Sequence, residues 1–119
     1  MSARASVVLA VCGGIAAYKA CEVLRGLQKS GCDVRVVMSE DACRFVGTAS
    51  FEALSGHAVV TSLYGNPDTP IPHVNLADSA ELCVVVPATA NVIAKMALGI
   101  ADDALSTTLL AMHRAVLVA

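Results

Sequence analysis

The sequence predicts an α/β domain built on a doubly wound parallel sheet. Short, valine-rich apolar runs recur along the 119 residues, and they are continuous rather than alternating, as in strands buried on both faces. Segments with the spacing of amphipathic helices separate these runs. The turns between the two kinds of segment are short, and no repeat or low-complexity linker divides the chain. One domain is therefore expected.

The first strand and helix are expected at residues 6–11 and 15–29. The strand is an unbroken apolar run, and the helix has apolar residues on one face and charged residues on the rest. Gly31 suits the left-handed residue that ends many helices. A second strand is expected at residues 34–38. Ser39 follows it, and a small hydroxyl before two acidic residues is typical of a helix start.

The remaining elements continue the alternation of strands and helices. We expect a short helix through Phe45, a helix at 50–54 and a strand at 58–61, followed by an irregular loop with three prolines at 65–72. A helix at 73–80 and a strand at 82–86 come next, and then a turn at 88–91. Helices at 92–98 and 101–112 and a strand at 115–119 complete the 119 residues. A last strand with no helix after it would leave one sheet face uncovered. Either an oligomer partner or a longer chain is expected to cover that face.

Composition excludes several classes of partner. The net charge is −2 and no Lys/Arg cluster occurs, so neither a nucleic acid nor a membrane surface is an expected partner. No apolar stretch reaches the length of a membrane span, and no signal peptide is recognisable. The five cysteines are an odd number without CxxC pairs, which predicts reduced thiols in a cytoplasmic protein and no metal site.

The stretch VCGGIAAYKA, residues 11–20, places Gly13 and Gly14 between the first strand and its helix. Glycines let backbone approach a ligand without a Cβ in the way. In a doubly wound sheet, ligands bind outside the carboxyl ends of the strands, and a helix N-terminus favours phosphate. The alternative interpretation is that the two glycines only make a tight turn.

The pattern narrows the kind of phosphate ligand. The residues CGGIAA lack the first and last glycines of the G-x-G-x-x-G dinucleotide fingerprint, and no G-K-[ST] follows them. Ser39 stands where an acid would hold a ribose diol. A mononucleotide site remains, with hydroxyls supplied by Ser39, Thr89 and the Ser106-Thr107-Thr108 run.

The stretches CGGIAAYK, VVMSEDA and HVNLADSAELCVVVPATANVIAKMALGIADDALSTTLLA resemble the homo-oligomeric flavin-containing cysteine decarboxylase family. The resemblance covers essentially the whole chain, and its most specific part is PATAN followed by G-x-A-D-D-x-L-[ST]-T. It implies a Rossmann-like, flavodoxin-like fold in which residues 1–119 form an FMN-binding decarboxylase domain, truncated at its C-terminus. Within the family, the chain is most similar to the phosphopantothenoylcysteine decarboxylases of coenzyme A biosynthesis.

The resemblance also implies roles for particular residues. His73, in the HVNL context, matches the catalytic histidine of the family. Its members assemble as trimers or clusters of trimers with FMN between subunits, so a homo-oligomer is expected. The residues that match FMN contacts are Gly13, Gly14, Ile15, Ser39, Phe45, Ala88, Thr89, Ala90, Asn91, Ser106 and Thr107.

The implied reaction is FMN-dependent decarboxylation of 4′-phosphopantothenoyl-L-cysteine, a small cysteine-containing substrate, to 4′-phosphopantetheine. Oxidising the thiol to a thioaldehyde provides the electron sink that a cysteine carboxylate lacks, and the flavin carries that redox step. His73 suits a general base or an orienter of the carboxylate. The family's substrate-binding asparagine and its flap cysteine come after the point matched by Ala119, so full activity of this chain is not expected.

Three other functions are considered. A peptidyl-cysteine decarboxylase of lantibiotic maturation and a non-catalytic flavin-binding regulatory subunit remain open. A flavin prenyltransferase is less favoured, because a serine would be expected in the glycine turn.

Other polar residues receive structural interpretations. His57 and His113 are assigned no chemistry. Asp102 and Asp103 are expected to complement a helix dipole, and Asn91 to cap its helix.

Overall fold

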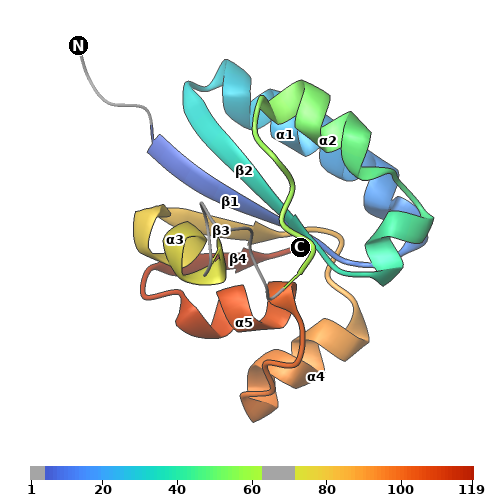
Figure 1. Ribbon diagram of the computed structural model, residues 1–119, viewed down its shortest axis with the longest axis vertical. Helices are drawn as coiled ribbons and strands as arrows, with labels where there is room; N and C mark the ends of the chain where they lie inside the picture. Colours follow the sequence, from blue (N-terminus) through green and yellow to red (C-terminus); the bar gives the residue numbers. More distant parts are fainter. Residues whose placement is uncertain (1–4, 63–71) are drawn as a thin grey trace.

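The structure, a computed structural model, describes residues 5–62 and 72–119. Within them, four parallel strands form one sheet in the order β2-β1-β3-β4. The strands are β1 (Ala5–Val11), β2 (Cys32–Met38), β3 (Leu82–Val85) and β4 (Ala115–Val118). Figure 1 shows this sheet between layers of helices, which confirms the predicted doubly wound α/β fold.

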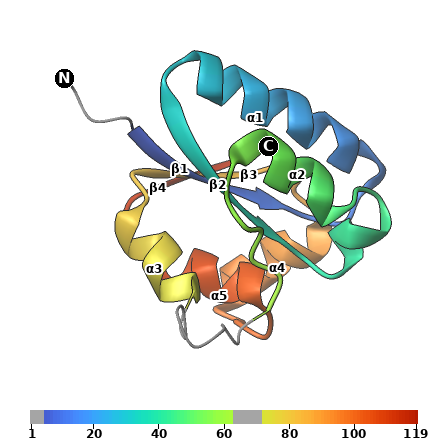
Figure 2. The same cartoon turned by 45° about the horizontal axis from the view of Figure 1, so that its top comes forward.

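Helices cover both faces of the sheet. On one face lie α1 (Ala20–Lys29) and α2 (Thr48–Ser55), and on the other lie α3 (Pro72–Ser79) and α5 (Ala104–Ala111) (Figures 1 and 2). Helix α4 (Ala90–Leu98) extends away from the sheet at the lower end of Figure 1. Two short 3-10 helices, η1 (Ile15–Lys19) and η2 (Asp41–Arg44), follow β1 and β2.

The central strand β1 explains why its sequence is an unbroken apolar run. Val7, Leu9 and Val11 pack in one core cluster with residues of α1 and α2. Val8 and Ala10 point the other way and pack in a second cluster with residues of α3 and α5. Successive side chains of a strand face opposite sides, so a strand covered on both sides needs apolar residues throughout.

The predicted helix at residues 15–29 is present but begins as the 3-10 helix η1 before continuing as α1. Ala20 and Leu24 of α1 are fully buried against the sheet. The side-chain amide of Gln28 donates a hydrogen bond to the carbonyl oxygen of Leu54 at 2.7 Å, which ties α1 to α2. Gly31 follows with φ of 91°, as predicted for the end of this helix.

Two predicted elements were wrong in extent. The strand expected at residues 58–61 is a single parallel bridge between Val60 and Val37, held by two hydrogen bonds of 2.9 and 3.0 Å to the edge of β2. The helix expected at 101–112 begins only at Ala104, because the Asp103 side chain accepts a hydrogen bond as its N-cap. The proline-rich loop was predicted at residues 65–72, and 65–71 lie outside the described residues.

The outermost strand, β4, is thinly covered. Val116 packs against the cluster that contains α5 residues, but Leu117 on the opposite face is 56% exposed. Of the four residues of β4, all but Val116 are exposed. None of the helices in the described ranges has both the length and the apolar character needed to cross a bilayer.

Candidate functional site

Most of the predicted cofactor residues gather at the carboxyl ends of three neighbouring strands. The glycine turn follows β1, Ser39 follows β2, and Pro87 follows β3 after Val86. The Ser39 N–H donates to the carbonyl oxygen of Val11 at 3.1 Å, so the tips of β1 and β2 are joined. In open parallel sheets this edge is where ligands bind.

The two glycines of the turn have different roles. A Cβ on Gly13 would overlap the Cβ of Asp41 and lie only 2.9 Å from the Asp41 carbonyl carbon, so this position has no room for a side chain. A Cβ on Gly14 would lie 3.4 Å from the nearest atom of Pro87, which is ordinary contact, and 4.0 Å from Thr89. Gly13 therefore packs the turn against η2, whereas Gly14 brings it beside the loop after β3.

The start of η1 offers backbone donors at this edge. The Gly14 N–H donates to the carbonyl oxygen of Cys12 at 3.1 Å, and the Ala17 N–H donates to that of Gly14 at 2.9 Å. The intervening N–H groups of Ile15 and Ala16 open the helix, where no earlier helical carbonyl can accept them. The Ile15 side chain is 84% exposed, so only its backbone faces the turn closely.

The loop after β2 combines a hydroxyl and an aromatic ring. Ser39 Oγ accepts a hydrogen bond from the Ala42 N–H at 3.1 Å, although the N-cap of η2 is Glu40 rather than Ser39. Its own O–H has no acceptor among the described residues and remains available to donate. Phe45 follows η2 and is 51% exposed, so its ring is accessible next to this edge.

The loop after β3 begins with a cis peptide bond between Val86 and Pro87 and leads into α4. Thr89 is the N-cap, because its Oγ1 accepts a hydrogen bond from the Val92 N–H at 3.2 Å. The predicted capping role of Asn91 is therefore wrong, since Asn91 lies inside the first turn with its side chain exposed. Ala90 and Asn91 bring first-turn N–H groups to the edge.

Ala88 connects this loop to the sheet. Its N–H donates a hydrogen bond to the carbonyl oxygen of Ala119 at 2.7 Å, and the Ala119 N–H donates to that of Val85 at 2.9 Å. The backbone donor of Ala88 is therefore already used, and a ligand contact at this residue would have to be made by other atoms.

The two predicted hydroxyls of α5 differ sharply. Ser106 Oγ accepts hydrogen bonds from the N–H groups of Asp102 and Asp103, both at 3.1 Å, and lies next to the Asp103 carboxylate. Both acceptor sites and the donor of this hydroxyl are thus occupied in a capping box. Thr107 Oγ1 is buried and has no hydrogen-bond partner among the described residues, an arrangement that normally costs free energy.

A charged pair beside this capping box was not predicted. Lys95 Nζ of α4 lies 2.8 Å from Oδ1 of Asp102, and the Lys95 side chain is only 18% exposed. The hydrogen bond to Asp102 raises the pKa of Lys95 and lowers the pKa of Asp102. The partners are seven positions apart, one on α4 and the other in the turn before α5, so no spacing within a single helix could have indicated that they meet.

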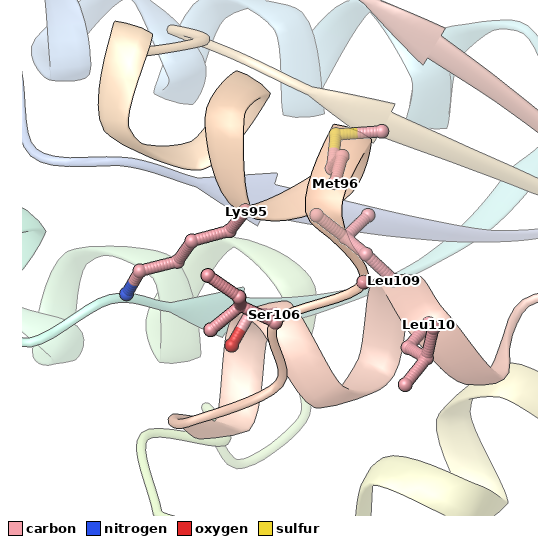
Figure 3. A pocket seen from close by; sticks show the side chains of 7 residues that line it. Lys95, Met96, Ser106, Leu109 and Leu110 are labelled. Carbon is pink, nitrogen blue, oxygen red and sulfur yellow. The ribbon is translucent and has the colours of Figure 1, made fainter.

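A pocket of about 150 Å³ lies between α4 and α5 next to this pair. Figure 3 shows Lys95 and Ser106 at one end of it and Leu110 at the other. Its remaining lining includes Met96 and Leu109.

The predicted catalytic histidine, His73, lies in the first turn of α3, and its side chain is outside what the structure describes. The other two histidines lie elsewhere. His57 Nε2 is 2.8 Å from Asp33 at the start of β2, and His113 Nε2 is 3.2 Å from Asp78 shortly before β3. Both pairs are at the amino ends of strands, opposite the cofactor edge.

All five cysteines are free thiols. Cys12, directly before the glycine turn, and Cys83 are fully buried, and burial raises their pKa from 9.0 to about 11 and about 12. Cys43 is exposed. No group of three or more potential metal ligands occurs in residues 5–62 and 72–119.

We expect these buried thiols to affect stability only in alkaline solution. As pH rises above 9, the unfolded chain loses the thiol protons of Cys12 and Cys83 first, so the free energy of unfolding should fall until the folded-state pKa values are passed. Urea unfolding between pH 8 and pH 11, compared with a Cys12→Ala variant, measures this fall in the free energy of unfolding.

At pH 8 a thiol reagent should label the exposed Cys43 well before the buried Cys12 or Cys83. Equal labelling rates would contradict the buried positions.

Comparison with known proteins gives one consistent result. The sequence pattern of the Flavoprotein family matches residues 1–118. The chain is 54% identical over 108 residues to the coenzyme A biosynthesis bifunctional protein CoaBC of Bacillus subtilis. The matched region is 89% of this chain and 26% of that protein.

Two solved structures share the fold. The FMN-dependent cysteine decarboxylase SpaF superposes with a TM-score of 0.88 at 36% identity, covering 96% of this chain and 66% of that one. A PPC decarboxylase mutant complexed with pantothenoylaminoethenethiol gives a TM-score of 0.75 at 24% identity. This match covers 93% of this chain and 62% of that one. The chain thus spans about a quarter of the length of the CoaBC protein that it matches.

Proposed function

Because the chain belongs to the Flavoprotein family, we propose that it binds FMN and serves the decarboxylation of 4′-phosphopantothenoyl-L-cysteine to 4′-phosphopantetheine. The observation that carries this proposal is the 54% identity over 108 residues to a CoaBC protein. In these terms the chain is the carboxy-lyase part of coenzyme A biosynthesis.

The donor set at the carboxyl edge suits a phosphate monoester. Two helix starts, at η1 and α4, meet where Gly14 approaches Pro87 and Thr89, and helix N-termini attract anions through unpaired N–H groups. Ser39 adds a hydroxyl whose O–H has no acceptor among the described residues. Thr107 supplies a buried hydroxyl that has no partner within residues 5–62 and 72–119, which supports a polar neighbour there.

The residues proposed to hold FMN follow from this arrangement. The phosphate would lie at Gly13, Gly14 and Ile15 with Ser39. The loop from Ala88 to Asn91, together with Thr107, would surround the rest of the cofactor, and the accessible ring of Phe45 would pack by the isoalloxazine. Ser106 would act by ordering the neighbouring helix start, since its hydroxyl is already fully bonded.

When bound, FMN would supply the electron acceptor that oxidation of a cysteine thiol requires. The protein's part is to orient the substrate and to move protons. His73, in the first turn of α3, is proposed as the general base or as the group that orients the substrate carboxylate. An imidazole titrates near neutral pH and serves either role.

We further propose that the chain acts as a homo-oligomer, a trimer or a cluster of trimers, in the cytoplasm. Exposed apolar side chains gather on α4 and next to it, and they support burial by a second copy: Ile93, Met96, Leu98, Ile100 and Leu110. Five free thiols support a reducing compartment.

A peptidyl-cysteine decarboxylase is the second candidate. The observation in its favour is the similarity to SpaF, an FMN-dependent cysteine decarboxylase, at 36% identity over 96% of this chain. The two activities separate when the protein receives either 4′-phosphopantothenoyl-L-cysteine or a peptide ending in cysteine, and loss of CO₂ is followed by mass spectrometry. A protein that binds FMN and acts on neither would be a flavin-binding regulatory subunit.

FMN binding itself is the first test. Purified protein mixed with FMN should quench flavin fluorescence and retain a flavin absorption band after gel filtration, and released cofactor should have the mass of FMN. Riboflavin, which lacks the phosphate, should bind at least tenfold more weakly, because charge-assisted hydrogen bonds to the phosphate would be lost. Protein that takes up no FMN would contradict the proposed function.

A further inference from the structure

We infer that Lys95 and Asp102 form a latch that holds α4 against α5 and so positions the Thr89–Asn91 end of α4 at the cofactor edge. The latch itself is a structural claim, and its effect on FMN rests on the proposed function. Lys95 is thus a positioning residue rather than a cofactor ligand. The argument starts from how weakly α4 is otherwise held.

Helix α4 has little buried surface of its own. Val92 is its single buried residue, and the other side chains are exposed or partly exposed. Figure 1 shows the helix extending away from the sheet. By contrast, α5 is firmly attached, because Ala104, Leu105, Thr108 and Leu109 are all buried against the sheet and α3 side. A contact between α4 and α5 therefore restricts the movement of α4, because α5 is itself held by its buried side chains.

The Lys95–Asp102 pair is that contact. Its 2.8 Å separation is a hydrogen-bonding distance, and the Lys95 side chain lies at one end of the pocket with its nitrogen directed away from Leu109 and Leu110 (Figure 3). The partner, Asp102, is itself fixed: its N–H donates to Ser106 Oγ at 3.1 Å, within the capping box of α5. The latch thus runs from α4, through one ion pair, to the rigid start of α5.

The same pair lies close to the cofactor edge. Both Lys95 and Asp103 act electrostatically on Cys12, the residue before the glycine turn, and Asp41 in turn acts on Lys95. Lys95 is thus bonded to the Asp102 carboxylate, and the negative charges of Asp103 and Asp41 add electrostatic attraction. An ammonium neutralised in this way is poorly suited to bind a phosphate directly, which favours the positioning role.

The distinguishing experiment uses two variants and their combination. If Lys95 acts through Asp102, whose side chain is 60% exposed, Lys95→Met and Asp102→Asn should each weaken FMN binding by no more than about fivefold, the upper range for a surface ion pair. The double variant should be no weaker than either single variant, because both remove the same contact. Lys95→Arg should restore most of the affinity. FMN and riboflavin should be affected equally.

A direct contact between Lys95 and the FMN phosphate gives a different pattern. Asp102→Asn would then leave FMN binding unchanged or strengthen it, and Lys95→Met would weaken FMN but not riboflavin. Either result overturns the positioning role. Asp78→Asn is the matched control, because it breaks the ion pair with His113 at the opposite edge and should leave FMN affinity unaltered.

Amide hydrogen exchange without cofactor tests the latch independently of the proposed function. Loss of the pair should speed exchange in residues 90–98 by about fivefold while β1 and α5 keep their protection. Unchanged exchange in α4 overturns the latch whether or not FMN binds. Normal latch behaviour in a protein that takes up no FMN would instead contradict only the proposed function.

Discussion

Gly13→Ala is expected to abolish FMN binding and to lower the free energy of unfolding by about 1–3 kcal/mol, the usual range for overpacking. The added methyl would overlap the Asp41 side chain and press on backbone atoms of Asp41 and Ala42, the nearer at 2.9 Å. Backbone cannot rotate away as a flexible side chain would, so the glycine turn or η2 has to move. Either movement displaces the N–H groups proposed to hold the phosphate.

The chain offers a closely matched control in Gly14→Ala. Gly14 has extended backbone, with φ of −148° and ψ of 161°, which any residue adopts. Its Cβ would make ordinary contact at 3.4 Å with Pro87. Urea unfolding should therefore show near-normal stability for Gly14→Ala and a large loss for Gly13→Ala. Equal effects at both positions would contradict the packing described for this turn.

His73→Asn is expected to lower the rate of substrate decarboxylation by 10²- to 10⁴-fold, the contribution typical of a positioned acid–base group. The asparagine keeps a polar side chain but cannot exchange a proton near neutral pH. FMN affinity should stay within about twofold, since the proposed phosphate contacts come from other loops. The measurement is single-turnover loss of CO₂, followed by mass spectrometry, with bound flavin quantified in parallel.

His57→Asn serves as the control for this experiment. His57 pairs with Asp33 at the start of β2, at the opposite edge of the sheet. Its replacement should cost a little stability and leave decarboxylation unaffected. A normal rate in His73→Asn would remove this histidine from the reaction.

The fold was largely predictable because burial on both faces leaves a simple pattern. The unbroken apolar run at β1 and the glycine after α1 correctly indicated a buried strand and a helix end. The segment at residues 58–61 was misleading: it has the apolar residues of a strand, but Val60 alone pairs with β2. The hydrophobic pattern and composition of a segment indicate how well its side chains suit a strand. Whether its backbone pairs with a neighbouring strand depends on the path of the chain in the folded protein.

The site was predictable in outline but not in its internal contacts. Strand ends and glycines indicated which loops meet, because parallel strands bring their carboxyl ends to one edge. The bond from Lys95 to Asp102 depends on how two helices pack, and no local spacing encodes it. For Ser106 a local signal did exist: an aspartate three residues before a serine at a helix start indicates a capping box.

The burial of β1 has a thermodynamic consequence. This strand lies inside the sheet with both faces covered, so its amides can open only when the whole domain unfolds. A ligand bound at the carboxyl end of β1 therefore stabilises the domain against global unfolding rather than against a local opening. Saturation at a hundredfold excess over the dissociation constant would add roughly 2.7 kcal/mol to the entire domain, and the melting temperature would report occupancy of the glycine turn directly.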